Sequence, residues 1–157
     1  MRTQGVKMYK HILISTDGSE VAQKGLDHGL ALAKAIGAQV SIITVTESFP
    51  VYASAGAGVG AGWVPIEMAD YDKVQDEFAN RVFASAKQAA DQQGVAIETV
   101  HIRNDQPAEA IIETAKTRGC DLIVMASHGR RGLGRLLLGS QTSEVVTRSP
   151  LPVLVVR

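Results

Sequence analysis

The residues His11–Glu20 read HILISTDGSE, and this stretch decides the fold class. Its first part, His11–Thr16, is dominated by Ile and Leu, which is typical of a strand buried on both faces. The turn that follows leads into a helix, with Asp17 or Ser19 available as the amino-terminal cap. A buried strand followed at once by a helix is the first half of a parallel βαβ unit.

The alternation of strand-like and helical patterns continues to the carboxyl terminus. Apolar runs recur at Val40–Val45, Val95–Ile102, Asp121–Ala126 and Val153–Val156, and helical patterns separate the five runs at residues 20–36, 67–93, 107–117 and 140–147. We therefore predict an α/β fold with one doubly wound, Rossmann-like parallel sheet of five strands in the order 3-2-1-4-5 and four helices. In such sheets ligands bind beyond the carboxyl ends of the strands, so the turns after strands one, two and four are the candidate sites.

The composition is that of one globular domain. The chain has 157 residues, 45% of them apolar and 20% charged, and its 16 Lys and Arg balance its 16 Asp and Glu. This excludes a disordered protein, and zero net charge gives no general reason to expect a nucleic acid or an anionic membrane as partner. We expect a single domain over residues 1–157, with 1–10 as a flexible amino terminus.

Three features lead us to expect a cytoplasmic protein. Cys120 is the only cysteine, so it has no partner for an internal disulfide, and we interpret it as a small core residue. Residues 1–10 lack the apolar core of a signal peptide. No stretch approaches the roughly 18 consecutive apolar residues of a membrane span.

The segment 46–65 is rich in Ala and Gly and shows neither the helical nor the strand periodicity of apolar residues, so we expect a mobile loop. Its glycines do not fit the dinucleotide-binding register Gly-x-Gly-x-x-Gly, because counting from Gly58 and Gly60 places the third position on Trp63.

The segment Ala126–Ser140, after the fourth predicted strand, is the most informative for function. It combines several glycines with three arginines and ends at Gly139-Ser140, where the last helix is predicted to begin. Glycines allow close backbone approach, and unpaired N–H groups at a helix start attract anions, so this is a candidate phosphate site. A Walker A loop is excluded, because Arg135-Leu136 stand where that motif requires Lys-Ser/Thr.

These residues resemble the universal stress protein family across nearly all of the chain from His11 to Arg157. Its ATP-binding members carry Gly-x2-Gly-x9-Gly-Ser/Thr, and here Gly129, Gly139 and Ser140 match while Ala126 replaces the first glycine. The opening Thr16–Glu20 and the ending Ser149–Arg157 are also similar to the family.

The resemblance implies that ATP or AMP binds with its adenine between strands one and two. Asp17 would face the adenosine, a backbone group of Val45 would read the adenine edge, and Ser15 and Thr16 would line the wall. The ribose and phosphates would lie between Met125, Ala126 and His128, while N–H and hydroxyl donors of Gly129, Gly139, Ser140, Gln141 and Thr142 would hold the phosphates. A Mg or Mn ion would rest mainly on phosphates and water, so no protein metal ligand is expected.

Each of these residues also has a plainer interpretation. Asp17 could only cap a helix, the glycines could only form turns, and Arg130, Arg131 and Arg135 could be a solvated surface. No serine, cysteine and acid arrangement surrounds His128 in the sequence, so we assign it no catalytic role. We interpret the apolar stripe of the helix at 67–93, formed by Met68, Tyr71, Val74, Phe78, Val82 and Ala86, as core.

The last strand, Val153, Leu154, Val155 and Val156, is predicted to lie at a sheet edge. The family resemblance implies that it pairs with its twin in a homodimer. Three function classes stay open: a regulatory nucleotide-binding stress protein, which we favour; a slow ATPase of the same fold; and an interaction protein that binds no nucleotide.

Overall fold

A computed structural model describes residues 8–47, 68–103, 105–129 and 137–157. The sheet is built from β1 (His11–Ser15), β2 (Gln39–Thr46), β3 (Ile97–Arg103), β4 (Leu122–Ala126) and β5 (Val153–Val156). The helices are α1 (Glu20–Ile36), α2 (Met68–Gln93), α3 (Pro107–Thr117) and α4 (Ser140–Arg148). The loop predicted at 46–65 lies mostly outside the described residues, and its first residue, Thr46, ends β2.

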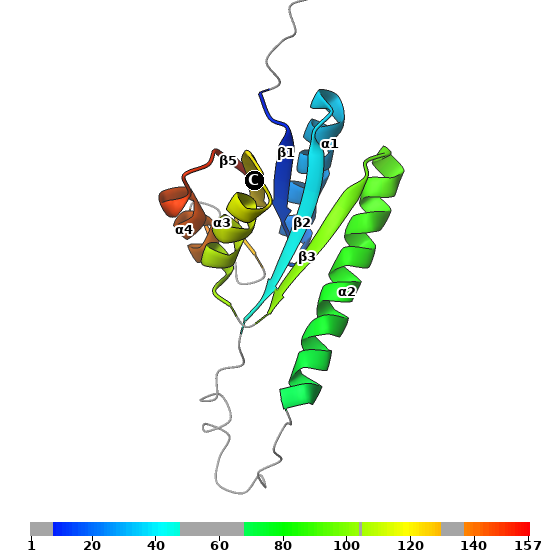
Figure 1. The fold of residues 1–157 in the computed structure, drawn as a ribbon, viewed down its shortest axis with the longest axis vertical. Coiled ribbons are helices and arrows are strands. Elements are labelled where there is room, and N and C mark those ends of the chain that lie inside the picture. The colour runs from blue at the N-terminus through cyan, green and yellow to red at the C-terminus, as the bar shows by residue number, and fades with distance from the viewer. Residues whose placement is uncertain (1–7, 48–67, 104, 130–136) are drawn as a thin grey trace, which may run out of the picture.

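All strand pairs of the sheet are parallel, and their order is β3-β2-β1-β4-β5, as predicted (Figure 1). Alternate residues of β1 supply opposite faces, because successive side chains of a strand point to opposite sides. Ile12 and Ile14 join a cluster with residues of α1 and α2. Leu13 joins a second cluster with residues of α3 and α4. The molecule is therefore a three-layer α/β/α arrangement that buries both faces of its central strands.

The ends of the elements follow local rules. Gly37, with φ of 66°, ends α1 in the left-handed conformation that glycine commonly adopts after a helix. The third strand begins at Ile97, two residues later than predicted, because Val95 still donates its N–H to the carbonyl of Ala90 and closes α2. Within the described residues, no helix is long and apolar enough to cross a membrane.

The turn before β4 fastens two strands together. The Asp121 carboxylate accepts hydrogen bonds from the N–H groups of Lys10, at 2.8 Å, and His11, at 3.0 Å, so it fixes the start of β1 beside β4. Its neighbour Cys120 is buried, as expected of a small core residue. Burial raises the pKa of the Cys120 thiol to about 11, so the thiol stays protonated and unreactive.

Candidate nucleotide-binding site

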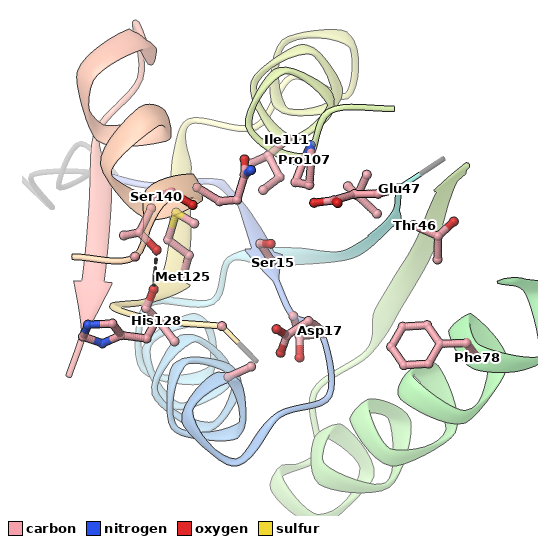
Figure 2. A pocket seen from close by; sticks show the side chains of 18 of the residues that line it. Ser15, Asp17, Thr46, Glu47, Phe78, Pro107, Ile111, Met125, His128 and Ser140 are labelled. Atoms are coloured by element: carbon pink, nitrogen blue, oxygen red, sulfur yellow. Dashed lines mark hydrogen bonds between the residues drawn. The ribbon is translucent and has the colours of Figure 1, made fainter. Parts of the chain in front are cut away.

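A pocket of about 560 Å³ opens at the carboxyl ends of β1, β2 and β4 (Figure 2). Its size is in the range of small-molecule sites. The structure brings all the sequence-predicted site residues together in its lining: Ser15, Thr16, Asp17, Val45, Met125, Ala126, His128, Gly129, Gly139, Ser140, Gln141 and Thr142. Strands that are distant in sequence end side by side here, which is why turns after three different strands share one cavity.

The turn between β1 and α1 places a carboxylate at the floor of the pocket. Ser19 is the cap of α1, because its hydroxyl accepts the N–H of Ala22 at 3.1 Å. Asp17 has a different role: its Oδ1 accepts the N–H of Ser19 at 2.9 Å, which orients the carboxylate. The structure thus resolves the choice between two caps in favour of Ser19 and leaves Asp17 lining the pocket.

The loop after β4 approaches this carboxylate closely. A Cβ atom on Gly129 would lie 2.7 Å from Oδ2 of Asp17, well inside van der Waals contact. Any larger residue would have to displace the carboxylate from its bond to Ser19 or move the loop. Gly129 therefore lets the loop approach Asp17 closely, and it lines the cavity.

The amino terminus of α4 supplies a set of backbone donors. Gly139 is the cap residue, and no side chain caps the helix among the described residues. The Gly139 N–H donates to the carbonyl of Ser127 at 2.8 Å, and a Cβ on Gly139 would sit 3.3 Å from that same oxygen. The N–H groups of the first turn begin at Ser140, which lines the pocket. The positive end of the helix dipole therefore lies at the pocket.

Two of the side chains predicted to face phosphates make internal hydrogen bonds instead. The Thr142 hydroxyl donates to the carbonyl of Ala126 at 2.9 Å, within a buried environment. Oε1 of Gln141 accepts the N–H of Ala108 at 3.1 Å, which satisfies a first-turn donor of α3 from a neighbouring helix. Thr142 can still offer an anion its backbone N–H, and Gln141 its backbone N–H and its side-chain Nε2 group.

The side chain of His128 is directed away from the centre of the pocket (Figure 2). Its Nδ1 is hydrogen-bonded to the hydroxyl of Ser127 at 3.0 Å, and Ser127 is buried and does not line the cavity. This pair is consistent with a role in fixing the loop after β4.

Sequence reasoning missed the wall that α2 contributes. Tyr71, Val74 and Phe78 line the pocket, and Val74 is 61% exposed. Assigning them to the core was therefore wrong, whereas Val82 and Ala86, farther along the same stripe, are buried as predicted. The only signal in the sequence is a change of size along the stripe, from aromatic side chains near its start to small ones that fit against the sheet.

Polar contacts fasten this part of α2 to the sheet. The Tyr71 hydroxyl and the Gln75 amide both donate to the carbonyl of Glu47, at 2.8 and 3.0 Å. Nε and Nη2 of Arg103 donate to the two oxygens of Asp76 at 2.7 and 2.6 Å. Such a bidentate pair fixes direction as well as distance. Together these contacts hold the helix at the ends of β2 and β3.

An imidazole completes this fastening. His101 on β3 lies with Nδ1 3.3 Å from Asp76 and Nε2 2.9 Å from the hydroxyl of Thr46. Burial lowers the pKa of His101 below its ordinary value, an effect that Asp76 opposes and Arg103 reinforces. The ring is therefore mainly neutral near pH 7.

A model of the universal stress protein family matches residues 8–157. The chain belongs to the universal stress protein family. Universal stress protein YxiE of Bacillus subtilis (strain 168) is 35% identical over 153 residues, which cover 96% of this chain and 100% of that protein.

Solved universal stress protein structures share the fold. The structure of protein MJ0577, known from Methanocaldococcus jannaschii, has a TM-score of 0.74 and 30% identity, covering 95% of this chain and 96% of its own. A universal stress protein in complex with cAMP has a TM-score of 0.66 and 24% identity, covering 96% of this chain and 98% of its own. At that identity, the second likeness shows the fold alone.

The family glycine motif is only partly described in this universal stress protein. Ala126, which replaces its first glycine, ends β4 in regular strand conformation, so this position requires no positive φ. Gly129, Gly139 and Ser140 line the pocket. The arginines at 130, 131 and 135 lie outside the described residues. Among the residues that the structure does describe, no group of three or more His, Cys, Asp or Glu side chains could hold a metal ion.

Proposed function

We propose that this universal stress protein binds an adenine nucleotide, ATP or AMP, and acts as a nucleotide-dependent regulatory protein in the stress response. The observation that carries the proposal is the division of the pocket into two chemical halves. One half holds the glycines and the start of α4, which no described side chain caps; the other holds apolar side chains from β2, α2 and α3, with the polar Gln75 and Arg81 of α2 beside them. A nucleotide has the same division between phosphates and base.

The anion-binding half can hold phosphate groups without a lysine. Gly129 and Gly139 lack the Cβ atoms that would crowd the cavity, and the backbone N–H groups of Ser140, Gln141 and Thr142 lie in the first turn of α4. Backbone donors at a helix start bind phosphates by hydrogen bonding and by the helix dipole together. A Mg or Mn ion would bind through the phosphates and would balance their charge.

The apolar half fits the base and the ribose. Val45 of β2 and Pro107 and Ile111 of α3 border this part of the pocket. Asp17, whose carboxylate is already oriented by Ser19, would accept a hydrogen bond from the adenosine. The complex of another universal stress protein with cAMP supports the assignment at the level of fold.

We also propose a homodimer joined through β5. The carbonyls of Pro152 and Val156 accept hydrogen bonds from Ile123 of β4 and from Ser127 just after it. Backbone groups of the intervening Val153 and Val155 therefore face the open side of the sheet. All residues of β5 are half-buried, although the strand is last in the sheet. Antiparallel pairing of two copies would satisfy both edges at once.

Stabilisation by ligand tests the nucleotide proposal. Millimolar ATP or AMP is expected to raise the free energy of unfolding, by about 2.7 kcal/mol when the ligand is at 100 times its dissociation constant. A Gly139→Val variant, whose side chain would meet Ser127 and His128, is the matched control and is expected to lose the effect. Phosphate release from ATP over hours, measured with both proteins, distinguishes a regulatory binder from a slow ATPase. Absence of any stabilisation favours an interaction protein that binds no nucleotide.

A further inference from the structure

Phe78 is one of two aromatic side chains of α2, with Tyr71, that line the pocket. The residue is half-buried, and its ring points from α2 into the cavity, on the side opposite α4 (Figure 2). Tyr71 and Val74 lie on the same face of the helix, at spacings of seven and four residues before it, and also line the pocket. The ring therefore lies in a wall of α2 side chains that also includes the polar Gln75 and Arg81.

The backbone that carries this ring is held on both sides. Two residues before it, Asp76 makes its bidentate pair with Arg103 and contacts His101. One turn after it, Val82 packs against the turn that follows Asp17, where a Cβ on Gly18 would lie 3.0 Å from Cγ2 of Val82. A side chain positioned in this way loses little freedom when a ligand arrives, which favours binding.

The opposite side of the same cavity is rich in backbone donors. An anionic group at Gly129 and the start of α4 would leave the rest of a nucleotide to extend toward α2. Aromatic side chains stack on nucleobases because every base presents a flat π face, and the larger purine face gains more contact than a pyrimidine.

We propose that Phe78 stacks on the base and makes the site select purine nucleotides over pyrimidine nucleotides. The inference rests on the proposed function, because it assigns a specificity-determining residue to that same site. Phe78 thereby acts through contact with the ligand, whereas Asp76, Arg103 and His101 position the helix.

Titrations with ATP and UTP, which carry the same triphosphate, test the inference. Phe78→Ala is expected to weaken ATP binding about tenfold and UTP binding less, so that the preference for ATP narrows. Phe78→Tyr keeps a ring and is expected to retain the preference. Phe83→Leu changes a core aromatic residue of the same helix that does not line the pocket, so it is the control for loosening of α2 and is expected to leave both affinities unchanged.

A spectroscopic readout separates stacking from a structural effect. Trp63 is the only tryptophan, so Phe78→Trp in a Trp63→Phe background places a single reporter in the wall. Stacking predicts that ATP quenches its fluorescence. The inference is overturned if Phe78→Ala leaves ATP binding intact, if it weakens ATP and UTP equally, or if ATP binds without quenching. Failure of the unsubstituted protein to bind any nucleotide instead defeats the proposed function, and the inference falls with it.

Discussion

Asp17 and Gly129 lie close together at the carboxyl ends of β1 and β4. The Asp17 carboxylate fills the space that a Cβ atom on residue 129 would need. The distance from an ideal Cβ on Gly129 to Oδ2 of Asp17 would be 2.7 Å. The other oxygen of the same carboxylate accepts the N–H of Ser19, so the group is restrained in rotation. This contact joins the two loops that the proposed nucleotide would touch.

Gly129→Ala is expected to weaken ATP binding about tenfold or more, since overpacking costs typically 1–3 kcal/mol and tenfold in affinity corresponds to about 1.4 kcal/mol. Calorimetric titration measures the loss. Asp17→Ala in the same background removes the oxygen that the new Cβ would meet. The double variant is therefore expected to lose less ATP-binding free energy than the sum of the losses of the two single variants. Strict additivity would contradict the contact.

His101 predicts a dependence of stability on pH. Its pKa is lowered in the folded protein, mainly by burial, so below about pH 6.5 the unfolded chain binds more protons than the folded one and stability falls as the pH falls. The loss levels off once the pH drops below the folded-state pKa. His101→Gln, which keeps a polar group near Thr46, is expected to flatten this part of the profile. Urea unfolding at a series of pH values measures it, and identical profiles for both proteins would refute the prediction.

Val155→Pro is expected to convert the proposed homodimer to a monomer while preserving the fold. The change removes an outward-facing N–H, and proline is tolerated at edge strands where the missing donor faces away from the sheet. Val155→Ala, which keeps the N–H, is the matched control and should remain dimeric. Sedimentation at micromolar concentration measures the mass. A monomeric unsubstituted protein would refute the edge pairing.

Cys120 is expected to resist alkylation in the folded protein. Burial raises its pKa from 9.0 to about 11, which leaves very little thiolate at pH 8 and lowers the reactive fraction on the order of a hundredfold. Iodoacetamide labelling followed by mass spectrometry gives a single readout, because the chain has no other cysteine. Equal labelling rates with and without denaturant would show that the thiol is not buried.

The fold could be predicted from the sequence because each strand and helix carries its own signal. Apolar runs such as Val40–Val45 lie between helical patterns that end at residues such as Gly37, and their order leaves little choice of topology. The pocket at the ends of β1, β2 and β4 follows from the same order, since parallel strands end at one edge.

The remaining part of the site depends on contacts between distant residues. Tyr71, Val74 and Phe78 have the same helical spacing as the buried residues after them, yet they line the pocket. The bond from Ala108 to Gln141 joins two helices that no local pattern relates. Such pairings are decided by packing, which periodicity does not encode.

Calorimetric titration of ATP and AMP into the purified protein tests the central claim most directly. If the start of α4 and the Asp17–Gly129 contact form a nucleotide cradle, at least one of the two ligands will bind with a stoichiometry of one per chain, and Gly139→Val will abolish the heat. The titration is repeated at a second temperature, so that a binding enthalpy of zero at one temperature does not hide binding. The account is contradicted if neither nucleotide gives binding heat at millimolar concentration at either temperature.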